Sequence, residues 1–288
     1  MIPAPELPST YHRVGLNSYL RRPPPMPVAH RHNEMEFLYL LGGTTYYSFG
    51  GHRVKLPPRT LILFWSGVPH QVLESNHQAL LCGLEIPLAW YLHWNLPAEL
   101  NYHLLGGKIL YETSPEFSES DAALTGHWRE DINSSSTNRR RAVLLEIEAR
   151  LWRFADSQKG GQSRSLATPA GVLEDIEVSR IERMARFIAE NYTRPLHVRE
   201  VAGVVNLHPN YAMKLFSKGF GSNFSGYLNQ FRVAHAQRLL TLSDAKITET
   251  AKASGFGSLS RFNSNFRQIT GLSPRAYRAG MGFPLSAP

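Results

Sequence analysis

The sequence predicts an α+β fold: an antiparallel β-barrel with a helical hairpin, followed by an all-α domain that contains two helix-turn-helix units. Short β-rich runs with close turns between them occupy residues 35–86. Amphipathic helical patterns take over from residue 118. A short helix, a turn and a second helix then occur twice after residue 197. We therefore expect a first domain over residues 1–155, a linker over 156–173 and a second domain over 174–288.

The first domain is expected to begin with an extended arm, because residues 1–28 are rich in proline. Five β-rich runs follow, and Gly50-Gly51 between two of them suits a two-residue hairpin turn. The runs are 35–41, 44–49, 52–56, 60–65 and 79–86. Short strands with no helix between them imply an antiparallel barrel or a jelly roll. We expect its interior to take the aromatic side chains of Tyr39, Tyr46 and Trp65.

Two helices, over residues 118–133 and 137–154, form the predicted hairpin. The second helix has one broad apolar stripe, with Arg150 among the polar positions around it. The stripe consists of Val143, Leu144, Ile147, Leu151 and Phe154. Two interpretations remain open: the stripe packs on the barrel of its own chain, or part of it contacts a second subunit.

A polar segment rich in Gly and Ser, Asp156 to Gly171, is typical of a flexible linker. After a helix over 178–191, the first helix-turn-helix unit spans residues 197–220. Pro209 suits the first position of its second helix. A helix over 223–242 follows, and at ~1.5 Å per residue it spans roughly 30 Å. That length is close to one turn of DNA, about 34 Å.

The second helix-turn-helix unit begins at Ile247 and turns at Gly255, which takes a positive φ at little cost. Ser258 is expected to cap a helix whose apolar stripe is Phe262, Phe266 and Ile269. The opposite face is polar and basic, as a helix that enters a major groove requires. The side chains predicted to contact bases in the two units are Asn210, Met213, Lys214, Ser260, Arg261 and Ser264. Those predicted to contact phosphates are Ser217, Lys218 and Arg267.

Charge supports a polyanionic partner for the second domain. The chain has a net charge of +8, from 31 Lys and Arg against 23 Asp and Glu. From residue 172 onward the counts are 15 and 8, whereas residues 1–171 hold 16 and 15. Such a concentration favours nucleic acid, with an acidic membrane surface as the main alternative. No apolar run approaches ~18 residues, and the single cysteine, Cys82, gives no disulfide framework. We therefore expect a cytoplasmic protein that does not contact a membrane.

The second domain resembles the DNA-binding domain of AraC/XylS transcription regulators over residues 181–278. The closing part of the signature is Gly255-Phe256, Ser260, Phe262, Phe266-Arg267, Gly271, Ser273-Pro274 and Tyr277-Arg278. The upstream part is Ala202, Tyr211, Phe216, Gly221, Tyr227, Arg232 and Leu239-Leu240. Two features depart from the family pattern: His208-Pro209 stands where Ser or Thr often caps the helix, and a basic residue is displaced to Lys218. The segments 60–71 and 92–97 further resemble the melibiose-type branch of the family.

The first domain also fits this resemblance, because His30-x-His32-x3-Glu36 and Gly67-x2-His70 resemble the two cupin motifs. The family's sensor domain is a cupin-type barrel, which implies that the chain binds a small-molecule effector. The resemblance to the melibiose-type branch implies a sugar or glycoside. The effector-binding residues expected from it are His30, His32, Glu36, Trp65 and His70.

His30, His32, Glu36 and His70 form a possible site for a divalent metal, because alternate residues of a strand point to the same side. The other interpretation is that regulators of this family keep these residues without metal, as polar groups at the mouth of the barrel. We expect no resident cofactor, and the metal stays an open alternative.

Together these features indicate a homodimeric regulator that binds double-stranded DNA, responds to a sugar-like effector, contacts RNA polymerase and activates transcription. It is not expected to be an enzyme. The main alternative is a metal-dependent cupin enzyme fused to a DNA-binding domain, although the Pro-x-Gly of the second cupin motif is missing before Gly67. A DNA-binding protein without an effector is the third interpretation.

Overall fold

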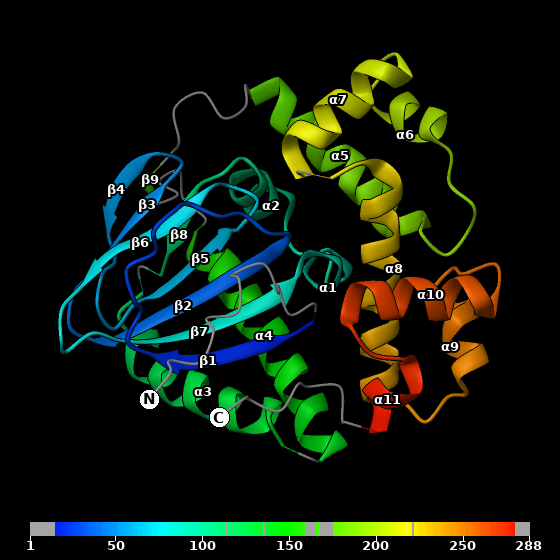
Figure 1. The fold of residues 1–288 in the computed structure, drawn as a ribbon. Coiled ribbons are helices and arrows are strands. Elements are labelled where there is room, and N and C mark those ends of the chain that lie inside the picture. The colour runs from blue at the N-terminus through cyan, green and yellow to red at the C-terminus, as the bar shows by residue number, and fades with distance from the viewer. Residues whose placement is uncertain are drawn as a thin grey trace, which may run out of the picture.

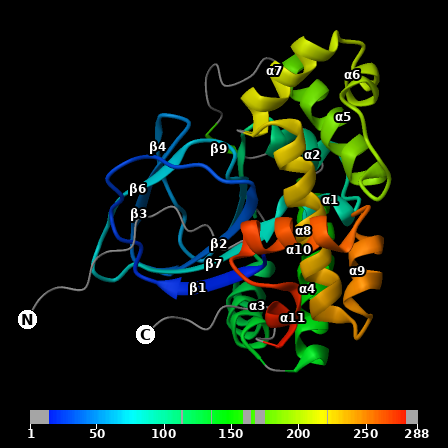
Figure 2. The same ribbon diagram turned by 45° about the vertical axis from the view of Figure 1, so that its right-hand side comes forward.

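The computed structural model describes residues 15–112, 114–134, 136–158, 165–167, 175–220 and 222–279. A β domain leads into a helical hairpin, and a helical domain follows (Figure 1). The predicted fold class is confirmed. The helical domain lies along one side of the β domain, and its long helix α8, Phe224–Leu242, runs beside the helices of the β domain (Figures 1 and 2).

Two antiparallel sheets form the β domain, and among the described residues they do not close into one continuous barrel. The large sheet has the order β1-β7-β2-β5-β8-β9, and the small sheet has the order β4-β3-β6. The strands of the large sheet are β1 Asn17–Arg21, β7 Leu80–Pro87, β2 Glu34–Gly42, β5 Leu61–Trp65, β8 Ile109–Tyr111 and β9 Ser165–Ala167. Those of the small sheet are β4 His52–Lys55, β3 Thr45–Phe49 and β6 His70–Ser75. An isolated bridge between His30 and His70 extends the small sheet.

Several strands lie where the sequence did not predict them. β1 falls inside the proline-rich arm and pairs with β7, while residues 1–14 of that arm lie outside the described residues. β9 falls inside the expected linker and pairs with β8; most of the linker also lies outside the described residues. β6 and β8 were not expected either. The hairpin turn at Gly50-Gly51 is confirmed, since both residues have positive φ.

Successive side chains of β2 point to opposite faces of the large sheet. Leu38 and Leu40 face the small sheet, whereas Phe37 and Tyr39 pack on the helical side. Trp65 also belongs to the helical side, and Tyr46 is only half-buried, so the expectation that Tyr39, Tyr46 and Trp65 fill the interior was wrong. The adjacent Tyr47 occupies the interior instead. A shift of one residue along a strand moves every side chain to the other face of the sheet. The sequence pattern alone did not determine which residues face which way.

Four helices cover the large sheet or flank it. They are α1 Leu88–His93, α2 Ala98–Leu105, α3 Phe117–Ile132 and α4 Thr137–Ser157. The apolar stripe of α4 packs on its own chain, since Ile147, Leu151 and Phe154 are fully buried in the main core. This settles the two interpretations of that stripe in favour of intrachain packing.

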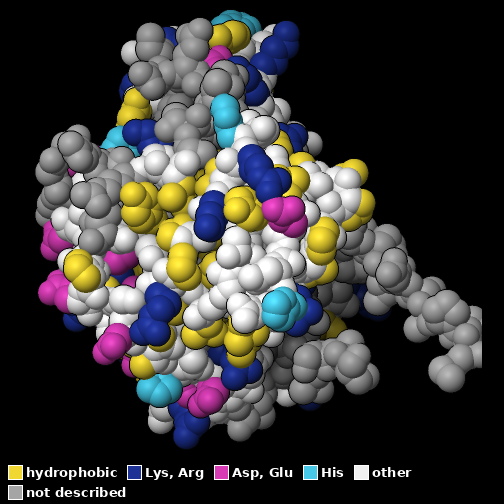
Figure 3. All heavy atoms as spheres, turned by 90° about the vertical axis from the view of Figure 1, so that its left-hand side faces the viewer, with side chains coloured by type: hydrophobic (Ala, Val, Ile, Leu, Met, Phe, Trp, Pro, Cys, Tyr) yellow, Lys and Arg dark blue, Asp and Glu magenta, His cyan; other side chains and the backbone are white. Residues whose placement is uncertain are grey.

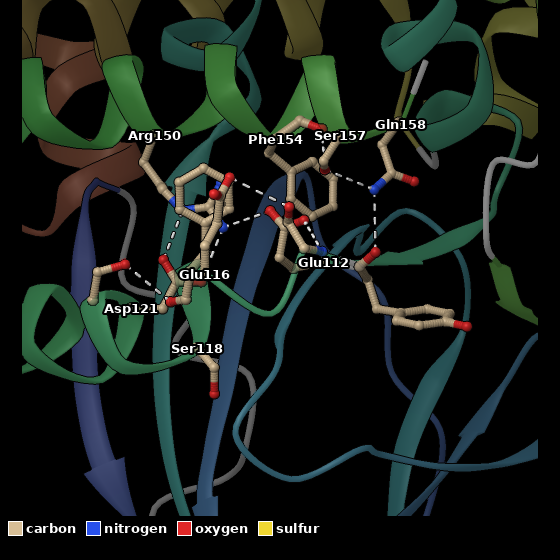
Figure 4. Close-up of polar contacts among 12 residues, drawn as sticks. Glu112, Glu116, Ser118, Asp121, Arg150, Phe154, Ser157 and Gln158 are labelled. Atoms are coloured by element: carbon tan, nitrogen blue, oxygen red, sulfur yellow. Dashed lines mark hydrogen bonds and ion pairs between the residues drawn. The ribbon is translucent and has the colours of Figure 1, made fainter. Parts of the chain in front are cut away.

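A buried arginine fixes the hairpin to the sheet (Figure 4). Arg150 of α4 is 1% exposed, although the pattern placed it among the polar positions. Its Nε donates to Asp121 Oδ1 of α3 at 2.6 Å, and its terminal nitrogen donates to Glu112 Oε2, just after β8, at 2.7 Å. The guanidinium also lies 4.4 Å from the ring centre of Phe117. The two carboxylates and the aromatic face compensate the buried charge, although the other terminal nitrogen, Nη1, has no hydrogen-bond partner among the described residues.

Seven helices follow in the described part of the chain: α5 Asp175–Asn191, α6 Val198–Val204, α7 Pro209–Phe220, α8, α9 Ile247–Ala253, α10 Leu259–Thr270 and α11 Pro274–Ala279. The predicted double helix-turn-helix is therefore confirmed as α6–α7 and α9–α10. Helix α7 packs on the first half of α8, and α10 packs on its second half (Figure 1). None of the helices in the described residues combines the length and the apolar character needed to span a lipid bilayer.

The two helix-turn-helix units belong to different cores. One continuous cluster of buried residues joins the helical side of the β domain to α5, α6, α7 and the first half of α8. Within it the ring of Trp65 lies 5.5 Å from that of Phe220, and Trp90 Nε1 donates to the carbonyl oxygen of Ala234 at 2.6 Å. A separate cluster around Phe262 and Phe266 holds α9, α10 and α11 on the second half of α8. The first unit is thus packed as part of the β domain, and the second is not.

Candidate DNA interface and effector site

Helix α10 presents an exposed polar face on a well-formed scaffold. Ser258 caps the helix by accepting from the backbone N–H of Arg261, and Gly271 ends it with φ 76°. Phe262 and Phe266 are fully buried beneath it. The predicted contact residues Ser260, Arg261, Ser264 and Arg267 are all exposed on the other side. The arrangement offers hydrogen-bond donors and positive charge to a partner without any acidic side chain on the same face.

Helix α7 presents a comparable face with a different start. It begins at Pro209, and His208 Nδ1 accepts from the backbone N–H of Asn210 at 3.3 Å. The histidine therefore performs the capping that Ser or Thr performs in the family pattern. Three predicted contact residues, Asn210, Lys214 and Ser217, are exposed, whereas Met213 is half-buried against the main core.

Lys218 near the end of α7 has an intrachain partner. Its Nζ lies 2.7 Å from Glu177 Oε2 of α5. The lysine is half exposed, so the pair is of the solvated kind that contributes little to stability. A phosphate that approached Lys218 would have to compete with Glu177. Arg267 and Lys214 have no ion pair with another described residue.

The face of the β domain that is remote from the helical domain has a different charge distribution from α7 and α10. Figure 3 shows the face formed by the β domain, where Lys and Arg side chains lie among Asp and Glu side chains. An example is Arg53, whose guanidinium pairs with Glu74 across the small sheet. This agrees with the near balance of charge in residues 1–171 and indicates that a polyanion is attracted to the helical domain.

The three histidines that the sequence singled out come together with Glu36. Ring centres of His30 and His70 are 4.3 Å apart, and those of His32 and His70 are 5.3 Å apart. The Nε2 atoms of His32 and His70 each lie 3.0 Å from the same oxygen, Glu36 Oε1. Ser66 Oγ donates to that oxygen at 2.9 Å. The side chains of His32, Glu36 and His70 are nearly fully buried.

The other ring nitrogen of both histidines is already committed. His70 Nδ1 donates to the carbonyl oxygen of Val68 at 2.9 Å, and His32 Nδ1 donates to Glu34 Oε2 at 2.8 Å. Both Nε2 atoms are therefore directed at a carboxylate while Nδ1 carries a hydrogen. Burial alone would lower the pKa of His32, but Glu34 and Glu36 outweigh it and raise that pKa to about 10. Burial likewise opposes ionisation of Glu36, yet His70 and His32 hold its pKa well below the ordinary value.

A cavity of about 240 Å³ lies beside this histidine cluster, between the two domains. The β domain contributes the segment Arg31–Glu34, Gly67 and the junction of β7 with α1. The helical domain contributes Phe220 and Ser222, between α7 and α8, together with three residues of α8. His32 therefore reaches both the cluster and the cavity. Trp65 lies just behind the wall at Gly67, where a Cβ would meet the indole ring at 2.3 Å.

The structure thus brings His30, His32, Glu36 and His70 together and turns Trp65 toward the helical domain. Reasoning from sequence missed the contributions of the helical domain to the cavity. It also missed the contact of Tyr192 with His235, where the phenol and Nδ1 are hydrogen-bonded beside His93. The aromatic residues around Phe220 and Phe231 were visible as apolar positions of two amphipathic helices, but that pattern does not show which side chains reach another domain.

Comparison with known families identifies both parts of the chain. Residues 26–94 match the model of the AraC-like ligand binding domain. Residues 201–280 match a model described as a helix-turn-helix domain.

Among curated proteins, the chain is similar over nearly its whole length to the melibiose operon regulatory protein of Escherichia coli K12. The two are 29% identical over 275 residues, which cover 94% of this chain and 89% of the relative. The regulatory protein PocR of Salmonella typhimurium is 36% identical over 100 residues, or 35% of this chain and 33% of the relative. A solved structure of ToxT from Vibrio cholerae aligns with 92% of this chain and 98% of its own, at 15% identity and a TM-score of 0.45.

Proposed function

The chain belongs to the AraC family of transcription regulators, with a ligand-binding domain ahead of a helix-turn-helix domain, and from this we propose that it is a sugar-responsive activator. The observation that carries its DNA-binding role is the pair of exposed polar faces on α7 and α10. Both faces lie on helices that pack on α8, α7 on its first half and α10 on its second half. With 19 residues, α8 spans about 28 Å at ~1.5 Å per residue, close to one DNA turn.

Within this role we assign a contact to each predicted residue of the two recognition helices. Asn210, Met213 and Lys214 read bases in one major groove, and Ser260, Arg261 and Ser264 read bases in the next. Arg261 suits a bidentate contact to guanine, because its guanidinium fork matches O6 and N7. Ser217, Lys218 and Arg267 contact phosphates, which position the protein without selecting a sequence.

Selection of bound DNA from a random pool tests the DNA-binding part. The wild type is expected to enrich a bipartite site whose halves are separated by about one helical turn. Enrichment of a single uninterrupted half-site, or no enrichment at all, would contradict the use of both units.

The effector that we propose is a sugar or glycoside, bound beside His30, His32, Glu36, Trp65 and His70. Support comes from the similarity to a regulator of a melibiose operon and from the mixture of polar and aromatic groups at the mouth of the β domain. Titration calorimetry with a panel of α- and β-galactosides tests this class. Heat that saturates with at least one galactoside supports it, and no heat from the whole panel would exclude galactosides.

Activation through RNA polymerase is the direction of regulation that we propose, with the protein acting in the cytoplasm where its DNA lies. The name of the 29%-identical relative indicates regulation of an operon and supports the role without fixing its sign. Transcription in vitro from a promoter that carries the selected site is expected to rise several-fold on addition of protein and galactoside. A fall below the basal level would show a repressor.

A second copy of this chain is the partner that we propose for the outer face of α4. Ala142, Leu145, Ala149 and Trp152 form an apolar stripe there, opposite the buried one. Leu145 is 60% exposed and Trp152 is 44% exposed. In an antiparallel pair that sets Leu145 against Trp152 of the partner subunit, Arg141 lies opposite Asp156 of the partner subunit, so the charges are complementary.

Sedimentation analysis tests this interface with two matched variants. Trp152→Glu places a charge in the stripe and is expected to convert a dimer to a monomer. Leu80→Glu changes a residue of similar exposure, 40%, on β7 and is expected to leave the dimer intact. A dimer that survives Trp152→Glu would place the interface elsewhere.

We propose that the protein has no resident cofactor, and a divalent metal at the histidine cluster is the alternative. His32 and His70 would supply Nε2, with His30 and Glu36 completing the set, and three of these residues have ligand atoms within 4.8 Å of one another. The fit rests on geometry, because Nδ1 of His32 and of His70 is held by Glu34 and Val68 in the way that orients metal-binding histidines. Mass spectrometry of metals in untagged protein tests the site, and less than about a tenth of an equivalent would remove it.

An enzyme of the metal-dependent cupin type is the alternative to a regulator. The same histidine cluster favours it, but the similar proteins named above are described as regulators. Turnover of sugar or aromatic substrates with added Fe(II) or Mn(II) separates the two. Turnover that is lost in His70→Ala would establish an enzyme.

A further inference from the structure

We propose that the effector binds in the cavity between the domains and is a neutral, hydroxyl-bearing ring that both domains contact. This inference rests on the proposed sugar-responsive function and names where the sugar sits. It extends the site from the mouth of the β domain to the turn between α7 and α8. The ligand would then contact the sensor and the first DNA-binding unit at the same time.

Two residues that line the cavity each have a buried polar atom with no hydrogen-bond partner among the described residues. One is Asn33 Oδ1 of the β domain, and the other is Ser222 Oγ of the turn before α8. Buried polar groups are nearly always satisfied in folded proteins, and each orphan costs about 1–3 kcal/mol. Because both residues line the cavity, rotation of either side chain would bring its oxygen to a ligand there, and one ligand could then hydrogen-bond to both walls.

The other lining groups indicate the chemistry of that ligand. Phe220 and Phe231 give apolar surface on the helical side, which suits the C–H face of a sugar ring. Gln230 adds an amide that both donates and accepts. The lining holds positive charge on Arg31 and on His32, whose pKa is raised to about 10, and negative charge on Glu34. Glu36, 3.0 Å from His32, supplies a second negative charge, so the cavity has no strong preference for an anion or a cation. At about 240 Å³ it is smaller than the ~300–1,000 Å³ of drug-sized pockets and holds one ring rather than a long chain.

The position of the cavity allows a bound ligand to affect the first recognition helix. Phe220 is the last residue of α7, and its ring packs against Trp65 of the sensor. A ligand between Asn33 and Ser222 therefore contacts the end of the first recognition helix directly. Because such a ligand binds one relative position of the domains better than another, it shifts the orientation of α7.

The barrel interior offers a contrasting location. Its side chains between the two sheets form an apolar cluster that includes Phe49, Val72 and the ring of Tyr47. A sugar there would have to displace close-packed apolar groups and would find few partners for its hydroxyls. This contrast supplies the control for the experiment.

Titration calorimetry on the full chain compares variants of the two cavity walls with a variant of the interior. The probe is the galactoside that gives the largest heat with the wild type. Asn33→Leu and Ser222→Leu block the two walls, and each is expected to weaken binding at least tenfold. Tyr47→Phe removes only a hydroxyl from the interior and is expected to stay within twofold of the wild type.

Wild-type affinity for the selected DNA shows that each variant is folded, and Gln230→Leu, at an exposed position, replaces any variant that fails this check. Normal binding in both wall variants with weakened binding in Tyr47→Phe would place the sugar in the interior, leaving the proposed function intact. Tighter binding of a sugar acid than of the neutral sugar would overturn the neutral class alone. No heat from any galactoside would overturn both this inference and the proposed effector.

Discussion

The two helix-turn-helix units have the same order of elements and different surroundings. Unit α9–α10 has its own cluster around Phe262, and its recognition helix begins with a serine cap. Unit α6–α7 shares a core with the sensor domain, and its recognition helix ends at Phe220 against Trp65. One recognition helix is therefore packed outside the core of the sensor, and the other shares that core.

This difference indicates a division of labour. A recognition helix whose position depends only on its own cluster reads its half of a site in the same way whether or not an effector is present. A helix that shares a core with the sensor changes position when the sensor does, because packed cores transmit displacement. The following predictions test that contrast, from the largest expected effect to the smallest.

Removing a buried aromatic side chain should destabilise different parts of the molecule in the two units. Phe216→Ala and Phe262→Ala both empty fully buried positions and are each expected to cost about 3–5 kcal/mol. Phe216 belongs to the shared core, so its loss should increase hydrogen exchange in the sensor domain as well as in α7. Phe262 belongs to the separate cluster, so the increase should stay within α9, α10 and α11. Exchange that spreads to the strands in both variants would abolish the distinction between the cores.

Loss of Arg261 should affect sequence choice in one half-site. Arg261→Ala is expected to cost about 1–3 kcal/mol of discrimination at one base pair of the half read by α10. The half read by α7 should be selected as before, because the two helices belong to separate cores on the two halves of α8. Binding-site selection with the variant measures both halves. Unchanged preference in the α10 half would show that this helix does not enter the groove as described.

Acid should weaken the packing around His235 of α8, which lies beside His93 of the sensor helix α1. Burial, helped by His93 and Arg238, lowers the pKa of His235 to about 4, and its Nδ1 accepts from the hydroxyl of Tyr192. Because the unfolded histidine titrates near 6.5, this stabilisation is complete above that pH and is lost as pH falls toward 4. Urea unfolding should therefore lose roughly 1 kcal/mol between pH 6.5 and 5.5 from this group.

His235→Asn removes the titration and supplies the control. Its unfolding free energy should be lower than that of the wild type at pH 7 and should change less between pH 6.5 and 5.5. An identical pH dependence in the variant and the wild type would assign the effect to other groups.

The smallest effect is expected on the salt dependence of DNA binding when either of the two lysines of α7 is replaced. Lys214→Ala should reduce the slope of log affinity against log salt by about 1, as loss of one phosphate or base contact does. Lys218→Ala should reduce it less, because Lys218 already pairs with Glu177. Equal reductions would show that the pair with Glu177 opens on DNA.

Prediction from the sequence succeeded where the determinants are local. The cap at Ser258, the turn at Gly255 with φ 81° and the buried stripe of Phe262 and Phe266 follow from spacing along one helix. The histidine cluster was also predictable, because its members lie at the start of a strand and at the end of a nearby turn. These features need no knowledge of distant parts of the chain.

Features that join distant segments were not predictable in the same way. The side to which Trp65 points depends on the register of β5 against β2, and burial of Arg150 depends on carboxylates from α3 and β8. The cavity needs Asn33 and Ser222, which are far apart in the sequence and become neighbours only when α8 packs on the sensor. Periodicity identifies an apolar or polar face but not its partner.

The most direct test of the division of labour uses DNA in which one half-site at a time is scrambled. The affinity of the wild type for each DNA is measured with and without the galactoside that it binds. We predict that the sugar changes the penalty for scrambling the α7 half at least tenfold and leaves the penalty for the α10 half within twofold. Equal changes in both halves, or a change confined to the α10 half, would contradict control of the first unit by the sensor.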